Sequence, residues 1–202
     1  MRGKSLSPGL RFFGNLVDLD CHIQDLKLVF RRTEEIEFPE HENLVEGESL
    51  ISGIFPDITR KSFIVTLLIA LDGQFKTFCE ILREATGQNL RWNDLKGSAL
   101  ERFITYGEKI CGLKSLYDDS TRQKLIGLIE VRNCIVHNNS SLEGFGKRAI
   151  VEGFSKQMEG IEIHDEYIDL ELSACNACAD IVLEFMQRAY YSALERFPRD
   201  EH

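Results

Sequence analysis

The sequence lacks the long apolar runs from which membrane-spanning segments are built. Its longest apolar stretch, residues 63–71, has nine residues including one threonine and ends at Asp72, whereas a transmembrane helix needs about 20. Near the first residue, Pro8 and Gly9 stand where a secretory signal would carry an unbroken apolar segment. We therefore expect a cytoplasmic protein without a membrane span.

Paired metal ligands are also scarce in this chain. One CxxC, formed by Cys175 and Cys178, has neither the second pair nor the nearby histidines that a four-ligand zinc site requires. The six cysteines are scattered rather than densely and regularly spaced, so we interpret them as reduced and mostly buried. No HxxxH or HxH pair is formed by His22, His41, His164 and His202. We expect no metal and no cofactor.

Positive charge is in deficit. The chain has 24 Lys and Arg against 33 Asp and Glu, for a net charge of −9. Nonspecific binding to nucleic acid depends on many Lys and Arg side chains that displace counterions. Broad attraction to RNA or DNA is thus excluded, and any RNA contact has to be local.

Apolar residues recur at helical spacing over most of the chain. The pattern predicts helices over about 10–36, 58–86, 98–111 and 120–138, and a last helix from Ser173 to about 196. Gly87 is the expected stop of the second helix, and Ser120 with Gln123 has the form of a capping box at the start of the fourth. Between the first two helices, Pro39 and several glycines and acidic residues indicate a connector over 38–57.

The apolar period changes from 3.6 to 2 between residues 161 and 172. Alternation on both sides of a polar turn at 164–166 predicts a β-hairpin, and 149–154 is a candidate for another short strand. The predicted fold class is all-α, an antiparallel bundle of four to five helices with a small β-hairpin insertion, at about 149–172, before the last helix. We expect a single domain over 1–202, with an N-terminal helix and connector at 1–57 and the core bundle at 58–198.

The segment 132–137 carries the residue types of phosphodiester chemistry near one helix end. Arg132 offers a guanidinium, Asn133 an amide and His137 an imidazole. On a helix, Asn133 and His137 are four residues apart and share a face. Arg132 is five residues from His137 and lies well round the helix, so it must reach back or meet a second subunit.

Arg132 followed by Asn133, with His137 after four intervening residues, resembles the signature of the HEPN superfamily of small helical bundles. The order of elements also matches: a long helix comes first, the motif ends a later helix, and a further helix follows. The stretches 95–109 and 135–139 are similar to bacterial HEPN proteins, and the resemblance covers about 59–196. It implies a metal-independent endoribonuclease of toxin or defence type, active on RNA as a homodimer whose two motifs form one composite site.

Cleavage of RNA beside a 2′-hydroxyl needs a group that takes a proton, a group that stabilises charge on the phosphate and a group that protonates the leaving oxygen. His137 suits the first or third task, because an imidazole titrates near neutral pH. Arg132 suits the second, because it stays protonated and presents a planar donor fork. Asn133 either orients the imidazole or donates to the phosphate. The expected product is a 2′,3′-cyclic phosphate.

Four residues are secondary candidates. Asp72, in the second long helix, would tune His137 or hold Arg132. Asn138, Lys147 and Arg148 would contact the RNA backbone, although the loop 144–148 is equally typical of an ordinary approach to a hairpin.

The alternative function is a noncatalytic HEPN module for dimerisation or interaction, which binds a protein or nucleotide partner. An antitoxin or other protein partner is compatible with either function. In the noncatalytic alternative, His137 at the helix end complements the helix dipole, and Arg132 pairs with Glu130 or with an acidic neighbour across the dimer.

Overall fold

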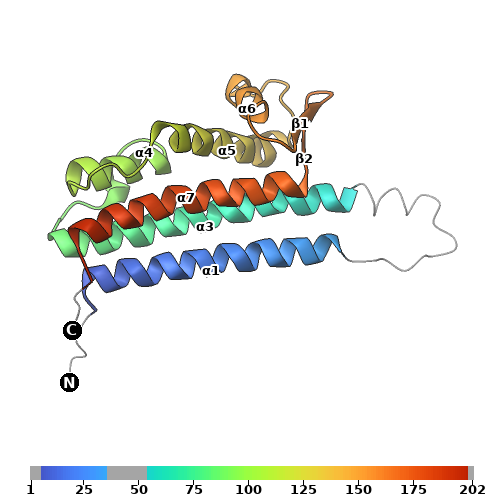
Figure 1. Ribbon diagram of the computed structural model, residues 1–202. Helices are drawn as coiled ribbons and strands as arrows, with labels where there is room; N and C mark the ends of the chain where they lie inside the picture. Colours follow the sequence, from blue (N-terminus) through green and yellow to red (C-terminus); the bar gives the residue numbers. More distant parts are fainter. Residues whose placement is uncertain (1–5, 36–53, 200–202) are drawn as a thin grey trace. The chain divides into compact units, whose positions relative to one another are not determined.

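The computed structural model describes residues 6–35 and 54–199. Helices dominate, and the described strands form a single two-stranded antiparallel sheet, which confirms the predicted all-α bundle with a small hairpin (Figure 1). Contacts divide the chain into two compact units. The first is drawn from Met1–His22, Ile69–Arg122 and Val182–His202, and the second from Ile23–Leu68 and Gln123–Ile181.

Three long helices, each contributing residues to both units, supply most of the core. They are α1 (Pro8–Glu34), α3 (Phe55–Thr86) and α7 (Leu172–Arg196). Pro8 occupies the first position of α1, where a missing N–H costs nothing, and Arg31 and Arg32 complement the dipole in its last turn. Gly87, with φ +66°, ends α3 as predicted. The predicted connector at 38–57 lies largely outside the described residues.

In the first unit, the core is a cluster of aromatic side chains. The rings of Phe75 and Phe103 stack with centroids 4.3 Å apart, and Phe78 lies 5.2 Å from Phe12 and 5.1 Å from Tyr190. All five side chains are almost fully buried. Such packed pairs add about 0.5–1.5 kcal/mol each beyond their area burial, which makes this unit a stable frame.

The helix predicted at 98–111 is present in two parts. Ser98 and Glu101 form a capping box at the start of α4 (Ala99–Ile104), and the chain continues as a π-helical turn, η3 (Thr105–Ile110). A short 3₁₀ turn, η2 (Trp92–Asp94), precedes them.

The second unit contains α6 (Arg148–Ser155), the hairpin and most of α5 (Asp119–Asn138). Strand β1 (Ile161–His164) pairs with β2 (Tyr167–Leu170) through a two-residue turn in which Asp165 and Glu166 both have positive φ. Arg60 attaches the hairpin to α3, because its Nη1 donates to the Leu170 carbonyl over 3.0 Å, while the guanidinium also forms an ion pair with Glu34.

Three predictions of local structure are wrong. Residues 149–154 belong to α6 rather than to a strand, because Val151 and Phe154 are three apart and both are buried on one helix face. The cap of α5 is Asp118 rather than Ser120, because its carboxylate accepts from the Thr121 N–H over 2.8 Å and from the Thr121 hydroxyl. Ser173 lies inside α7, which begins one residue earlier.

Helix α3 is also long and apolar enough to cross a membrane, by length and composition alone. In its most apolar 18-residue window, 44% of the residues are buried. A core helix of a soluble protein passes the same test, and the structure is compatible with a soluble protein.

Candidate functional site

The motif residues lie on the last turns of α5, outside the stripe that packs this helix. Leu125, Leu128, Val131 and Cys134 recur every three residues and are fully buried. Arg132 and Asn133 follow Val131 and are half-buried, whereas His137 is exposed. The helix is therefore fixed by its apolar stripe, and the motif side chains are left available at its surface.

Arg132 and Asn133 are joined by a hydrogen bond. Nη1 of Arg132 donates to Oδ1 of Asn133 over 3.1 Å, and Nδ2 of Asn133 donates to Oε2 of Glu130 over 3.3 Å. The noncatalytic alternative predicts a direct pair of Arg132 with Glu130. The Asn133 amide instead lies between the two side chains and bonds to both. Among the described residues, no ion pair includes Arg132, and its buried Nε–H finds no acceptor there. The guanidinium is thus held by an amide and has no carboxylate partner among the described residues.

His137 is exposed in the last turn of α5, and no ion pair among the described residues includes it. Because Asn133 is engaged by Arg132 and Glu130, the amide does not orient this imidazole within one chain. The structure thus brings Arg132 and Asn133 together and leaves His137 apart from both.

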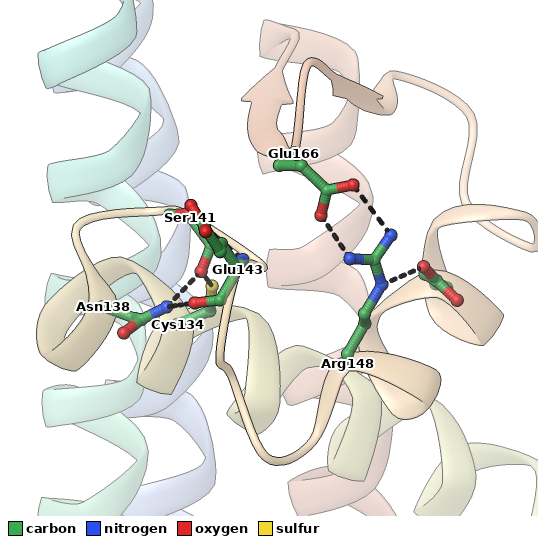
Figure 2. Close-up of polar contacts among 7 residues, drawn as sticks. Cys134, Asn138, Ser141, Glu143, Arg148 and Glu166 are labelled. Atoms are coloured by element: carbon green, nitrogen blue, oxygen red, sulfur yellow. Dashed lines mark hydrogen bonds and ion pairs between the residues drawn. The ribbon is translucent and has the colours of Figure 1, made fainter.

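Asn138 closes the loop that follows the motif (Figure 2). Its Nδ2 donates to the carbonyls of Ser141 and Glu143, over 2.5 and 3.0 Å, and the Cys134 thiol donates to the same Ser141 carbonyl. Asn139 has φ +50°, the left-handed conformation in which asparagine can end a helix. The Asn138 side chain therefore serves the local structure and has its donor committed.

This loop is also paired with the hairpin. The Ile168 N–H donates to the Ser140 carbonyl over 3.0 Å, and the Leu142 N–H donates to the Glu166 carbonyl over 2.7 Å. Ser141 thereby forms a β-bridge with Tyr167. The hairpin insertion is thus held against the end of the motif helix.

The two basic candidates after the motif differ in their surroundings. Arg148 forms an ion pair with Glu166 (Figure 2) and a second one, over 2.6 Å, with Glu152. The hydrogen bonds that its guanidinium donates to these two carboxylates raise its pKa. Lys147 is exposed immediately before α6 and is in none of the ion pairs among the described residues. Of the two, Lys147 retains an uncompensated charge for a phosphate.

Asp72 is exposed on the part of α3 that belongs to the first unit, whereas Arg132 and His137 belong to the second. Its proposed action on those residues stays a prediction.

Thiol and metal chemistry find no support in the described part of the chain. Five of the six cysteines are buried, as predicted, and only Cys21 is exposed. Burial raises the pKa of Cys175 to about 12 and raises that of Cys178 further. A thiol with a raised pKa is a poor nucleophile and ligand. Within residues 6–35 and 54–199, no group of three or more His, Cys, Asp or Glu side chains is arranged to hold a metal ion.

A groove of about 620 Å³ in the second unit was not foreseen from the sequence. It lies between the first turns of α3, the end of α5 and the hairpin. Its lining includes Ile58 and Lys61 from α3, Ile135 from α5, Asn139 after it and Tyr167 from β2. The one sequence feature that could have indicated this groove is Tyr167, an aromatic residue directly after the polar turn of the hairpin.

Comparison with known proteins gives no match to a family model, to a curated protein or to a solved structure.

Proposed function

We propose that this protein is a metal-independent endoribonuclease of toxin or defence type, acting in the cytoplasm as a homodimer, with Arg132, Asn133 and His137 as its site. The observation that carries the proposal is the state of Arg132, whose guanidinium is held by the Asn133 amide and has no carboxylate partner among the described residues. A positioned, uncompensated guanidinium is suited to a phosphate. The exposed imidazole of His137 adds a proton carrier on the same helix.

Two copies are needed because of the spacing on α5. At 100° per residue, Arg132 and His137 are separated by about 140° around the helix axis. In one chain they face different directions, and His137 has no link to the Arg132–Asn133 pair. In the proposed site, Arg132 and Asn133 of one copy bind the phosphate, and His137 of the second copy completes the site.

The proposed reaction is a transfer within the RNA strand. His137 takes the proton of the 2′-hydroxyl, and the 2′ oxygen attacks phosphorus. Arg132, assisted by Asn133, stabilises the charge that develops on the phosphate oxygens. The bond from phosphorus to the 5′ oxygen breaks, and that oxygen takes a proton from water, while the imidazolium releases its proton to solvent. The products are a 2′,3′-cyclic phosphate and a 5′-hydroxyl.

A noncatalytic interaction module is the second candidate. The net charge of −9 favours it, because an acidic surface is better suited to recruiting a protein partner than to binding RNA. The bridge from Asn133 to Glu130 also favours it, because this bridge gives the amide a purely structural use. Either function is compatible with restraint by an antitoxin or another protein partner.

The test is cleavage of total cellular RNA by the purified protein in excess EDTA. Wild type, Arg132→Ala and His137→Ala are compared, with His164→Ala as the matched control. His164 is also exposed in the second unit, where it pairs with Glu162 over 2.6 Å. Circular dichroism verifies that all variants are folded.

We expect wild type and the His164→Ala control to leave cyclic phosphate ends at similar rates. Loss of His137 should slow cleavage by about 10²–10⁴-fold, and loss of Arg132 by about 10²–10³-fold. Equal cleavage by all four proteins would reveal a contaminant or a different site. Absence of cleavage by wild type would favour the interaction module.

A further inference from the structure

We propose that the groove beside Tyr167 binds one unstacked RNA base next to the cleaved phosphate, with the Tyr167 ring as its stacking platform. The inference rests on the proposed function and assigns to that site a substrate contact. The ligand class is single-stranded RNA, whose splayed bases are commonly bound by stacking on aromatic side chains.

Tyr167 is exposed although its backbone is fixed. Its side chain is 52% exposed, while its residue pairs with His164 in the hairpin and bridges to Ser141. The hydrogen bonds on both sides of it tie the hairpin to the loop after α5. An exposed aromatic ring on a fixed backbone loses little conformational freedom on binding, which is the requirement for a stacking platform.

The lining of the groove matches a neutral, flat ligand rather than a phosphate. Among the described residues that line it, the one cation is Lys61, which pairs with Asp57 over 2.8 Å, so the two charges offset each other. Ile58, which is 55% exposed, and the half-buried Ile135 offer apolar surface, and the exposed Asn139 adds an amide beside them. Apolar walls with a few polar groups are typical of small-ligand sites, and a base presents an apolar face and a polar edge.

The groove borders the face of α5 that carries Arg132. Ile135 follows Arg132 by three residues, so their Cβ atoms lie about 5–6 Å apart on the helix surface. His137 is on another side of the helix, and Asn133 lies between the two, where it accepts the hydrogen bond from Arg132. A base in the groove would therefore lie next to a phosphate held by Arg132 of the same copy, while His137 comes from the second copy.

The test measures binding of a fluorescently labelled single-stranded RNA by anisotropy in EDTA. The proteins carry His137→Ala, which keeps the RNA intact, and are compared with and without Tyr167→Ala or Tyr167→Phe. The matched control is Tyr191→Ala, which removes a tyrosine that is 57% exposed on α7 in the first unit. RNAs with a single abasic position identify the bound base.

We expect Tyr167→Ala to weaken binding by about 5- to 100-fold, and Tyr167→Phe and Tyr191→Ala to stay within about twofold because stacking needs only the ring. At one abasic position, Tyr167→Ala should have no further effect. Unchanged affinity of a folded Tyr167→Ala variant would overturn the groove proposal.

Other outcomes separate this proposal from the ribonuclease itself. Cleavage by wild type with no effect of Tyr167→Ala on affinity would overturn base binding in the groove and support the ribonuclease proposal. RNA binding that depends on Tyr167, without cleavage by wild type, would overturn the ribonuclease proposal and support base binding in the groove. A Tyr167→Ala variant that sediments as a monomer, when wild type is a dimer, would show an interface between copies and overturn base binding.

Discussion

The close packing of α6 on α5 in the second unit predicts a large effect of one methyl group. Gly127 of α5 faces Phe154 of α6, and a Cβ at Gly127 would lie 2.5 Å from Cγ and Cδ2 of Phe154 and 2.7 Å from its Cβ. Phe154 is 3% exposed. Its ring can rotate away only into occupied space, and its Cβ cannot rotate at all, so Gly127→Ala requires α6 to move.

The expected size follows from two opposing terms. Alanine is favoured over glycine inside a helix by about 1 kcal/mol. Overpacking of a filled core costs about 1–3 kcal/mol, and the contact with a Cβ places this case at the upper end. Gly127→Ala should therefore lower the free energy of unfolding by about 2 kcal/mol.

The assay is equilibrium unfolding in urea, with Gly14→Ala and Gly73→Ala as controls. Both controls are helical glycines for which an added Cβ would meet no atom within 4 Å, and they should gain about 0.5–1 kcal/mol. With a slope of about 2 kcal/mol per M, the midpoint of Gly127→Ala should fall by about 1 M. A gain in stability for Gly127→Ala equal to that of the controls would refute the packing of α6 on α5.

Three further predictions concern the ends of α5 and the loop after it. Asp118→Ala should cost about 1 kcal/mol by removing the cap, and Asp118→Asn less. Hydrogen bonds donated by Thr121 lower the pKa of Asp118 from its ordinary value. The difference in urea midpoint between wild type and Asp118→Ala should therefore be fully present above the ordinary pKa of an aspartate and be lost as the pH falls through the lowered pKa. Asn138→Ala should cost about 1 kcal/mol in the same assay, because the carbonyls of Ser141 and Glu143 each lose a hydrogen bond. An unchanged midpoint would contradict the role of Asn138 in holding the loop after α5. Lys147→Ala should reduce the salt dependence of RNA affinity by about 0.7 in the log–log slope, as expected for one lost phosphate contact, whereas Arg148→Ala, whose charge is already paired, should leave that slope unchanged.

Most of the fold follows from periodicity. The C-terminal end of α3 and the turn of the hairpin were predictable, because Gly87 and the polar turn residues determine them locally. The segment 149–154 was not, because a short apolar run suits a strand and a helix equally, and contact of Phe154 with Gly127 decides between them. At the start of α5, Asp118 and Ser120 both have cap chemistry, and the two bonds with Thr121 select the former.

The site was predictable only as a set of residues. Placement of Arg132, Asn133 and His137 at one helix end follows from the sequence, since α5 ends at Asn138. The hydrogen bond between Arg132 and Asn133 depends on rotamers that no spacing rule supplies. The ion pair of Arg148 with Glu166 joins residues 18 positions apart and depends on where the hairpin folds back, so the sequence alone left Arg148 a candidate RNA contact.

The most direct test of the composite ribonuclease site mixes two inactive proteins. Arg132→Ala and His137→Ala are each assayed alone in EDTA and then after mixing in equal amounts under conditions that exchange subunits. If Arg132 of one copy works with His137 of the other, two-fold symmetry gives each wild-type dimer two such pairings. Half of the dimers in the mixture are mixed and contain one intact pairing, so the mixture should regain about a quarter of wild-type cleavage. A mixture as inactive as either variant alone, with wild type active, would contradict the composite site.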